Sequence, residues 1–294
     1  MMIAIDIGGT KTLIMFSSEN KMKEFLDETD FDVRNVNFND KYCTIGTSSI
    51  MNESNFHGFV STLKSIDGEV ISTFPGIVRV EYGKRIKFRV YSRRFPFLMG
   101  KYLDFDFVLN DAPAFTYFHA TDFFKEKENE EKTIMGVVMG TGINACHMNL
   151  WDFKRLTFVN RIFEAGHIRF DGDERCFCGR RGCAELRVSG KFLERIGGGD
   201  PERVFSDERL MELFYGNISD FFISLIITVS PHEIVIGGSV SKSVDTGLLK
   251  EKIESGLPHS KVDTGIRIRR DLSPLSHVKG LALAYKRFKQ KYGL

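Results

Sequence analysis

Residues 3–16, Ile-Ala-Ile-Asp-Ile-Gly-Gly-Thr-Lys-Thr-Leu-Ile-Met-Phe, predict two β-strands joined by a tight glycine turn. Isoleucines alternate with smaller or polar residues before the turn, and residues 12–16 after it are apolar and β-branched, as is typical of strands. The same order returns at residues 133–150, where the turn is Gly140-Thr141-Gly142. Its recurrence in both halves of the chain indicates an internal duplication.

The remaining hydrophobic patterns predict strands and helices in mixed order. We expect helices at residues 52–65, 112–127, 184–196, 207–229 and 276–291, with Ser206 as the N-cap of the fourth, and strands at 69–74, 78–82, 86–91, 105–109, 234–238 and 266–270. Residues 21–32 are expected to continue the first hairpin as a third strand, and the charged run 125–132 to be a solvated helix end or loop. This order is typical of an α/β protein with two related halves.

Composition excludes several classes of protein. The 294 residues carry 41 basic and 39 acidic side chains, a net charge of +2, and no basic block, which argues against nucleic acid as a partner. The longest apolar run, residues 221–229, is half of the roughly 18 residues that span a membrane. The N-terminus lacks a basic region and a cleavage site, so we expect no signal peptide. We therefore expect a soluble, cytoplasmic protein with no membrane partner.

The cysteine cluster is the strongest single signal for a bound group. Five cysteines is an odd number, and three of them fall in Cys176-Phe-Cys178-Gly-Arg-Arg-Gly-Cys183, which is unlike a secreted disulfide framework. The spacing and the two glycines suit a tight loop around a tetrahedral ion, and His167 lies nine residues upstream. A Cys₃His set closes the coordination shell, so a structural zinc is predicted. The alternative is a loop of reduced, packed cysteines.

Two carboxylates, Glu164 and Glu185, lie beside these expected ligands in the sequence. If His167 and the cysteines bind zinc, both carboxylates are fixed next to the metal loop. Held in this way, they could accept hydrogen bonds from the hydroxyls of a polyol. Without the metal, each would be interpreted as an ordinary surface residue.

Asp111 follows the apolar strand 105–109 and directly precedes a helix. Ligands of α/β proteins bind at the carboxyl ends of strands, where a carboxylate could take a proton from a hydroxyl nucleophile. The competing interpretation is a helix N-cap, a position that Asn110 or Asp111 could fill equally well.

Three glycine turns follow strands: Gly8-Gly9-Thr10, with Lys11 beside it, Gly140-Thr141-Gly142, and Gly237-Gly238-Ser239. Such turns expose backbone N–H groups that can cradle phosphate, so together they favour a nucleotide. The spacing Gly140-x-Gly142-x-x-Ala145 also matches a loose dinucleotide-binding pattern. That pattern requires a helix to begin at the turn, whereas residues 143–150 are typical of a strand.

Taken together, these residues resemble the ROK family of sugar kinases and regulators. The matching segments occur in family order over nearly the whole chain: Asp6-Ile-Gly-Gly-Thr-Lys11, Pro75-Gly76, Asn110-Asp111-Ala112, Gly140-Thr-Gly142, Glu164-Ala-Gly-His167, Cys176-x-Cys178-Gly-x-x-Gly-Cys183-x-Glu185 with Ser189-Gly190, and Ile236-Gly-Gly238.

The resemblance implies an α/β actin-like ATPase (ribonuclease H-like) fold of two α/β lobes with a central cleft and a zinc-binding loop. Residues 1–112 would form the small N-terminal lobe, to which the C-terminal helix 276–294 returns. Residues 113–275 would form the large lobe with the zinc loop.

The resemblance also implies a role for each matching residue. Asp111 would be the general base for the sugar 6-hydroxyl. Gly76, Asn110, Asp111, Glu164, His167 and Glu185 would hold the sugar. Asp6, Gly8, Gly9, Thr10, Lys11, Gly140, Thr141, Gly142, Gly237 and Gly238 would face ATP and Mg²⁺. Structural Zn²⁺ would be bound by His167, Cys176, Cys178 and Cys183.

The implied activity is transfer of the γ-phosphoryl group of MgATP to the 6-hydroxyl of a hexose or N-acetylhexosamine, such as glucose, N-acetylmannosamine or N-acetylglucosamine. The alternative is a non-catalytic sugar-sensing regulator or sugar-binding protein of the same family. Family regulators carry a DNA-binding domain before the opening motif, and with Asp6 at the sixth position we expect none. Relatives are often dimers or tetramers, so a homo-oligomer is expected.

Four positions depart from the family pattern. Asn144 stands where glycine is more usual after the second turn, and Pro113 follows the base motif. Ile77-Val78-Arg79 replaces the usual Pro-Val-Asp, and residues 90–99 lack the Asn- and Trp-containing loop of glucokinases. The last two departures fall where the family's sugar pocket lies, and they leave room for an N-acetylhexosamine.

Overall fold

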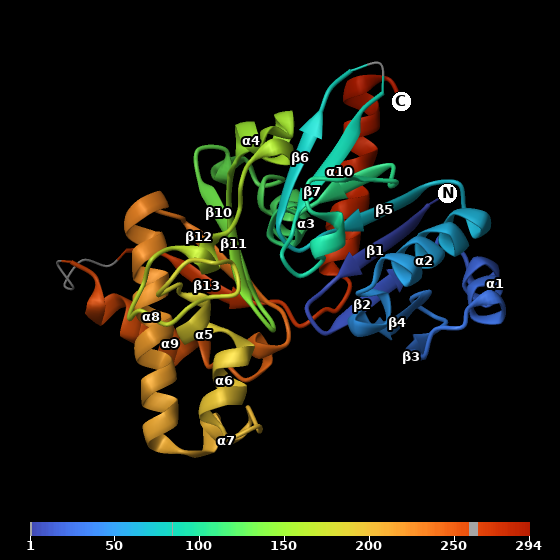
Figure 1. The fold of residues 1–294 in the computed structure, drawn as a ribbon. Coiled ribbons are helices and arrows are strands. Elements are labelled where there is room, and N and C mark those ends of the chain that lie inside the picture. Colours follow the sequence, from blue (N-terminus) through green and yellow to red (C-terminus); the bar gives the residue numbers. More distant parts are fainter. Residues whose placement is uncertain (1, 84, 259–263) are drawn as a thin grey trace. The chain divides into compact units, whose positions relative to one another are not determined.

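The computed structural model describes residues 2–83, 85–258 and 264–294. The chain forms two compact units. Unit 1 comprises Met1–Phe118, Arg155–Phe163 and Leu275–Leu294, and unit 2 comprises His119–Lys154 and Glu164–Pro274 (Figure 1). Unit 1 therefore runs past residue 112 into the first turns of a helix.

Unit 1 is built on a six-stranded sheet of order β3-β4-β2-β1-β5-β9. Its strands are β1 (Ile3–Ile7), β2 (Lys11–Met15), β3 (Val33–Asn37), β4 (Tyr42–Gly46), β5 (Val70–Thr73) and β9 (Phe107–Leu109). The β1–β2 hairpin is antiparallel, whereas β5 and β9 run parallel to β1. The hairpin and the two parallel strands confirm the predictions for those segments.

The helices of unit 1 are α1 (Glu19–Glu28), α2 (Glu53–Ile66), the first part of α3 (Asp111–Phe123) and α10 (Ser276–Tyr292), with the 3₁₀ turn η1 (Thr47–Ile50). Helix α10 contacts β1 and β5. Its Phe288 lies against Phe107 of β9, with ring centroids 4.8 Å apart. The C-terminal helix thus completes the core of this unit.

The expected third strand at residues 21–32 is wrong, because α1 occupies most of this segment. The Ser18 hydroxyl caps the helix by accepting the N–H of Lys21, at 3.3 Å. Met22 and Phe25, one helical turn apart, are both buried. The few apolar residues of this segment therefore have helical spacing, and the sheet continues instead with β4 and β3.

A second, three-stranded antiparallel sheet also belongs to unit 1. It consists of β6 (Ile77–Glu81), β7 (Lys87–Tyr91) and β8 (Tyr102–Leu103), and the 3₁₀ turn η2 (Pro96–Leu98) lies between β7 and β8. Strand β6 is tied to the 3₁₀ turn η4 (Thr157–Asn160), where the side-chain oxygen of Asn160 accepts the N–H of Val80 at 3.1 Å. This sheet begins directly after Gly76.

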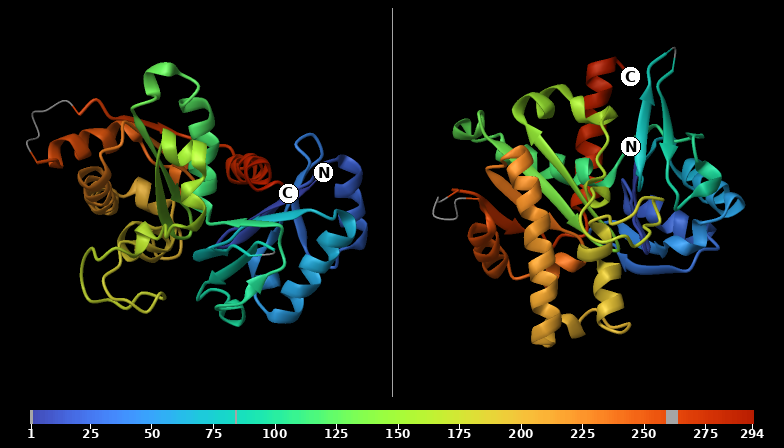
Figure 2. Two further views of the ribbon diagram at one scale, coloured as in Figure 1. Left: turned by 90° about the horizontal axis from the view of Figure 1, so that it is seen from above. Right: turned by 60° about the vertical axis from the view of Figure 1, so that its left-hand side comes forward.

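Unit 2 contains a four-stranded sheet of order β11-β10-β12-β13. Its strands are β10 (Thr133–Met139), β11 (Ile143–Asn149), β12 (Glu233–Gly237) and β13 (Arg267–Arg270). Its helices are α4 (Leu150–Arg155, whose last residue falls in unit 1), α5 (Glu185–Val188), α6 (Gly190–Ile196), α7 (Arg203–Ser206), α8 (Glu208–Val229) and α9 (Thr246–Gly256). The 3₁₀ turns of this unit are η3 (Lys127–Asn129), η5 (Ala165–His167) and η6 (Val240–Lys242). Helices α8 and α9 pack side by side, and both contribute to the hydrophobic core that includes β10 and β12 (Figure 2).

Two helix predictions for unit 2 need correction. The single helix expected at 184–196 is two helices, because Ser189 is extended (φ −98°, ψ 168°) and its hydroxyl accepts the N–H of Phe192 as the cap of α6. The N-cap of α8 is Asp207 rather than Ser206. Its carboxylate accepts the N–H groups of Arg209 and Leu210, which suits the positive end of the helix dipole.

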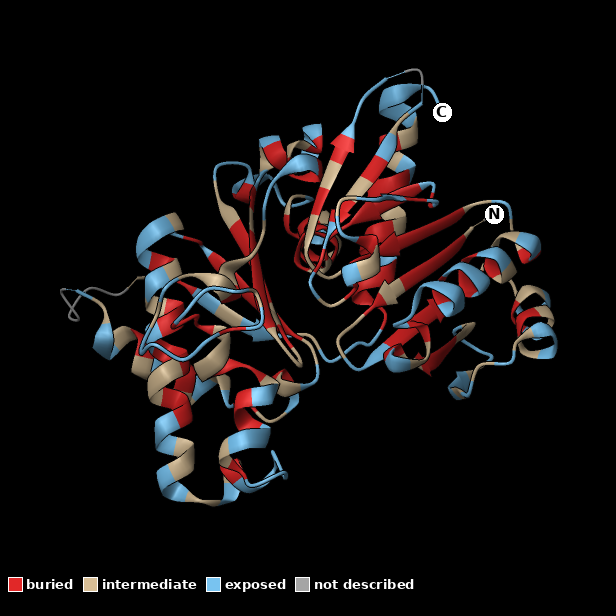
Figure 3. Cartoon of the chain, viewed as in Figure 1, coloured by how far each residue is buried: buried red, intermediate tan, exposed pale blue. Residues whose placement is uncertain are grey.

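In the described part of the chain, α8 is the one helix whose length and apolar composition would be enough to cross a membrane. Its phenylalanines Phe214, Phe221 and Phe222 are all fully buried in the core of unit 2. Figure 3 shows buried, intermediate and exposed positions following one another along this helix. The helix also packs against α5, α7 and α9. The apolar content of α8 is therefore used within the unit.

Candidate functional site

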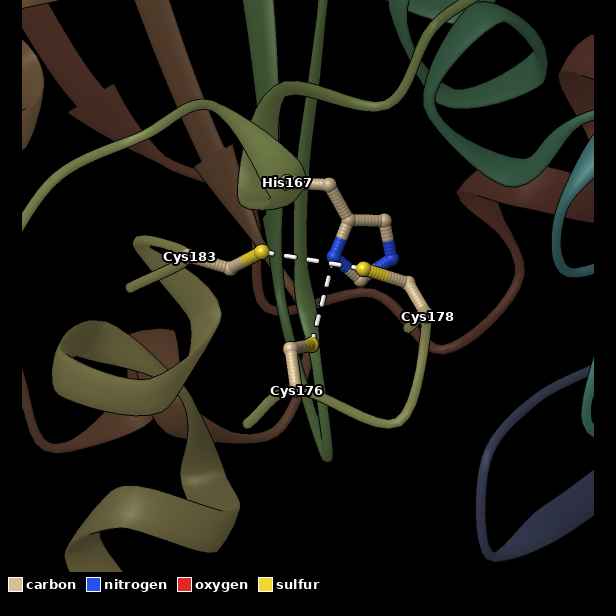
Figure 4. Close-up of side chains that lie close together, drawn as sticks. All are labelled: His167, Cys176, Cys178 and Cys183. Atoms are coloured by element: carbon tan, nitrogen blue, oxygen red, sulfur yellow. Dashed lines mark hydrogen bonds between the residues drawn. The ribbon is translucent and has the colours of Figure 1, made fainter. Parts of the chain in front are cut away.

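The predicted metal ligands lie together in unit 2. The side chains of His167, Cys176, Cys178 and Cys183 converge on one point (Figure 4), and their ligand atoms all lie within 4.8 Å of one another. The Sγ atoms of Cys178 and Cys183 are 3.6 Å apart, and Nδ1 of His167 is 3.7 Å from Sγ of Cys176. Zinc–sulfur bonds of about 2.3 Å give tetrahedral edges of about 3.8 Å. The side chains are therefore spaced for a four-coordinate ion.

Without a metal, the cluster is held in its neutral form by burial. Burial raises the pKa of the Cys176 thiol, and burial raises the pKa of Cys183 to about 12. Burial, and then the nearby charge of Arg180, lowers the pKa of His167, so the imidazole is in the neutral form that binds metals. Without a cation the buried thiols stay protonated, and a bound metal is what would ionise them.

The loop that carries the cysteines depends on glycines at its turns. Gly179 has φ +92° and Gly182 has φ +63°, a backbone conformation that favours glycine. A Cβ atom on Gly182 would lie 2.3 Å from the carbonyl oxygen of Gly172. The backbone N–H of Cys176 donates to the carbonyl of Arg180, at 2.8 Å. These contacts explain how ligands two and five residues apart face one centre.

Glu164 lies close to the same histidine. Because Nδ1 of His167 faces the cysteines, Nε2 is left on the other side of the ring, 3.6 Å from a carboxylate oxygen of Glu164. A carboxylate on the second nitrogen of a metal-binding histidine fixes the ring and its tautomer. The Glu164 side chain is only 22% exposed, so its interpretation as an ordinary surface residue is wrong.

The second glycine turn, residues 140–142, is held by several backbone contacts within unit 2. The N–H of Gly190 donates to the carbonyl of Gly140 at 2.8 Å, and the N–H of Lys191 donates to that of Thr141 at 3.3 Å. A Cβ on Gly142 would lie 2.5 Å from a carboxylate oxygen of Glu185. The structure thus brings the predicted phosphate turn and one predicted sugar ligand together.

The third glycine turn, residues 237–239, lies against the end of strand β10. Gly238 has φ +92°, and a Cβ there would lie 2.3 Å from the carbonyl oxygen of Met139, the last residue of β10. The end of β12 therefore contacts the strand that leads into the turn at 140–142, and a side chain at position 238 would separate them.

Asn144 links the glycine turn at residues 140–142 to the segment 164–167, a role that the sequence did not reveal. Its side-chain oxygen accepts the N–H of Ala165 at 3.0 Å, and the residue is only 8% exposed. A Cβ on Gly166 would lie 2.2 Å from the carbonyl oxygen of Ile143, so η5 lies directly on β11. Asn144 thus connects the strand after the phosphate turn to the segment that carries Glu164 and His167. The only signal in the sequence was a departure from glycine.

In unit 1 the predicted residues lie at the carboxyl ends of parallel strands. Asp6 pairs in register with Thr73, and Thr73 pairs with Leu109. The Thr73 hydroxyl donates to the Asp6 carboxylate at 2.5 Å. Gly76 and Asp111 follow these strand ends, so the structure brings the predicted carboxylates and Gly76 to one edge of the sheet.

The choice between Asn110 and Asp111 as N-cap is decided by where the helix begins. Helix α3 begins at Asp111, which leaves Asn110 at the N-cap. The N–H of Ala112 donates to the side-chain oxygen of Asn110 at 3.2 Å and to the Asp111 carboxylate at 2.7 Å. The amide nitrogen of Asn110 donates to the carbonyl of Gly76 at 2.9 Å. Asp111 is the first helical residue, where a carboxylate suits the positive end of the helix dipole.

The first glycine turn is supported by a residue that the motif does not include. The Thr47 hydroxyl donates to the carbonyl of Gly8 at 3.1 Å, and the N–H of Thr47 donates to that of Thr10 at 2.9 Å. A Cβ on Gly8 would lie 2.7 Å from the carbonyl of Lys11. The turn is therefore closed on itself and fixed by η1, with Lys11 exposed.

A cavity of about 420 Å³ lies elsewhere in unit 1, at the tip of the β6–β7 hairpin. It is lined by Glu81, Tyr82, Gly83, Arg85, Lys87 and Tyr102. Gly76 precedes the opposite end of β6. The cavity contains none of the predicted site residues.

Comparison with known proteins identifies the family of the chain. Residues 103–268 match the model of the ROK family. An N-acetylmannosamine kinase of Haemophilus influenzae is 28% identical over 156 residues, which are 45% of this chain and 48% of that protein, so the match spans about half the length of this relative. An N-acetyl-D-glucosamine kinase of Yersinia pseudotuberculosis is 25% identical over 219 residues, 61% of this chain and 67% of that protein.

A solved structure is similar over almost the whole chain. The ROK family glucokinase from Streptomyces griseus, in complex with glucose and AMPPNP, superimposes with a TM-score of 0.65 at 16% identity, over 97% of this chain and 99% of that one. At this identity the likeness concerns the fold alone. It confirms the actin-like α/β fold expected from the sequence.

Proposed function

The chain belongs to the ROK family, and from that premise we propose that it is a sugar kinase that transfers the γ-phosphoryl group of MgATP to the 6-hydroxyl of a hexose or N-acetylhexosamine. The observation that carries the proposal is the position of Asp111, two residues after the parallel strand β9, at the sheet edge to which β1 brings Asp6 and β5 leads into Gly76. The relatives named for N-acetylmannosamine and N-acetylglucosamine support the substrate class.

In this proposal Asp111 accepts the proton of the 6-hydroxyl as that oxygen bonds to phosphorus and the phosphorus–oxygen bond to ADP breaks. A carboxylate can accept a proton from a hydroxyl, and at the first position of α3 its negative charge lies at the positive end of the helix dipole. Asn110 holds the Gly76 carbonyl, and both orient the sugar. Phosphoryl transfer requires mainly positioning and charge neutralisation besides this base.

The phosphates of the donor are assigned to the glycine turns, whose backbone N–H groups suit anions. Thr10 and Lys11 serve in unit 1, and Gly140, Thr141 and Gly142 in unit 2, with Gly237 and Gly238 against the adenosine. Asp6 is the assigned carboxylate for Mg²⁺, which would neutralise charge on the transferring group.

We assign the Cys₃His cluster to a structural zinc. Four protein ligands leave no open position for water, which is the pattern of a structural rather than a catalytic site. The metal would fix His167 and, through Nε2, the Glu164 carboxylate. Glu164, His167 and Glu185 are then the sugar-hydroxyl ligands of unit 2.

The proposal is tested by ADP release from the purified chain with MgATP across glucose, mannose, N-acetylglucosamine and N-acetylmannosamine. Asp111→Asn should lower kcat by about 10²–10⁴-fold while sugar binding, followed by calorimetry, persists. Asp104→Asn is the matched control, since its carboxylate is 82% exposed and pairs only with Lys64 among the described side chains. Wild-type-like turnover of Asp111→Asn would refute the base, and sugar binding without any turnover would favour a non-catalytic sugar-binding protein.

A further inference from the structure

The turn of residues 92–95, which follows β7, touches the predicted sugar site of unit 1. Its closing hydrogen bond runs from the N–H of Phe95 to the carbonyl of Ser92, at 3.3 Å. A Cβ on Gly76, whose φ is +114°, would lie 2.5 Å from the carbonyl oxygen of Tyr91 and 3.1 Å from Cβ of Ser92. The turn is therefore in backbone contact with Gly76, whose own carbonyl is held by Asn110 at 2.9 Å.

Both ends of this turn are anchored in the core. Ser92 is 5% exposed and Phe95 is fully buried. The Phe95 ring lies 5.1 Å from that of Phe74, and the N–H of Phe74 donates to the carbonyl of Leu109 at 2.8 Å. The same strand ends that position Gly76 and Asp111 therefore position the turn.

The two central residues of the turn are arginines that have no partner among the described residues. Arg93 is exposed and Arg94 is half-buried, and neither guanidinium has a hydrogen bond, ion pair or ring contact with a described residue. Their neighbours in the adjoining sheet differ: Arg89 pairs with Glu81 at 3.0 Å, and Arg79 donates to the carbonyl of Asn160 at 3.2 Å.

Two adjacent like charges on an anchored turn repel each other, and a bound anion relieves that repulsion. Guanidinium groups bind carboxylates and phosphates through paired, charge-assisted hydrogen bonds, and they do so more strongly than they bind neutral hydroxyls. The free acidic groups needed to neutralise them are missing from the turn itself, whose other two residues are Ser92 and Phe95.

We propose that Arg93 and Arg94 select an acceptor that carries a negative charge: a sugar derivative with a free primary hydroxyl at one end and a carboxylate or phosphate ester at the other. The inference rests on the proposed kinase function, and it names the substrate class of that site. The hydroxyl end lies toward Asp111, and the anionic end meets the turn. A neutral hexose would leave the two guanidiniums without a counterion.

The test measures kcat/KM for matched pairs of acceptors with MgATP. Glucose is compared with glucose 1-phosphate and with gluconate, and N-acetylglucosamine with its 1-phosphate. The phosphate and carboxylate arms distinguish the two kinds of anion. We expect one anionic member to exceed its neutral partner by roughly tenfold to a hundredfold, with a preference that shrinks as the salt concentration rises.

The variants Arg93→Gln and Arg94→Gln, singly and together, should reduce the anionic-to-neutral ratio toward one, chiefly through KM. Arg209→Gln is the matched control: it removes one positive charge from an exposed position on α8 and should leave the ratio unchanged. Calorimetry of the same sugars with wild-type and double-variant protein reports binding independently of turnover.

The outcomes separate this inference from the proposed function. Turnover of neutral sugars with no anionic preference, or a preference that survives the double variant, overturns the role of the arginines while the kinase stands. Absence of turnover with any sugar, together with anion binding that the double variant loses, overturns the kinase and supports the anion site. Absence of both turnover and binding overturns both.

Discussion

The hydrogen bond between Asn144 and Ala165 gives a prediction that does not depend on activity. Asn144→Ala removes the oxygen that accepts the Ala165 N–H at 3.0 Å, within a contact so close that a Cβ on Gly166 would lie 2.2 Å from Ile143. The methyl group of alanine cannot accept a hydrogen bond, and the close contact leaves little room for a water molecule to do so. Leaving such a donor without a partner costs about 1–3 kcal/mol, which corresponds to roughly 5- to 150-fold in a local equilibrium.

The direct assay is amide hydrogen exchange of the segment that contains η5, Ala165–His167. Its exchange should accelerate by a factor in that range, because opening of the segment no longer breaks the bond to Asn144. Asn144→Asp keeps an acceptor oxygen and should restore most of the protection. Asn55→Ala, which removes an exposed hydrogen bond in unit 1, is the control. Unchanged exchange at η5 in Asn144→Ala would refute the argument that this side chain holds the segment on β11. Under the proposed function, the sugar KM should rise with the exchange rate.

Two further predictions concern the metal and the core. Cys178→Ser should lower the zinc content from about one per chain, because the serine hydroxyl is a poor substitute for a thiolate. Cys43→Ala, at a buried position on β4 outside the cluster, should keep the metal. Equal zinc content of the two variants by mass spectrometry would contradict the ligand set. Phe288→Ala should lower the free energy of unfolding, measured in urea, by about 3–5 kcal/mol, because this ring is 1% exposed and its centroid lies 4.8 Å from that of Phe107. The control is Leu294→Ala, at a residue that is 62% exposed. Equal effects of the two substitutions would contradict the packing of α10.

The elements that the sequence predicted well are continuous apolar strands and helices whose buried residues recur at helical spacing. Strand β1 is buried at nearly every residue, and α2 buries Phe56, Phe59 and Leu63 at helical spacing. Segment 21–32 has few apolar residues, and its helix depends on the cap at Ser18, a local hydrogen bond that hydrophobicity does not reveal. Strand β3 has three exposed residues in the middle, so it carries no alternation from which a strand could be predicted.

In the candidate site, some residues could likewise be predicted from the sequence and others could not. The four metal ligands were predictable because thiols and imidazole are chemically distinctive, whatever fold carries them. The residues that hold the site together were not: Thr47 supports a turn 39 residues away, and Asn144 reaches a backbone N–H 21 residues away. Threonine and asparagine occur throughout the chain, so only the folded backbone shows which of them lie beside a motif.

The two sheets explain why the predicted site residues recur in pairs. Unit 1 contains the order β2-β1-β5-β9, and unit 2 the order β11-β10-β12-β13, each an antiparallel hairpin followed by two parallel strands. A glycine turn closes each hairpin, and a glycine of positive φ, Gly76 or Gly238, follows the first parallel strand added to each.

The residue that follows the last parallel strand of each sheet shows how a duplicated fold assigns different roles to equivalent positions. An aspartate follows the last parallel strand in both units: Asp111 after β9 and Asp271 after β13. The Asp271 carboxylate lies 3.0 Å from Nε2 of His119 and is 12% exposed, so an imidazole already occupies it. The Asp111 carboxylate instead accepts the backbone N–H of Ala112 at 2.7 Å, so the corresponding aspartates of the two units have different partners. Under the proposed function, the one in unit 1 is the base.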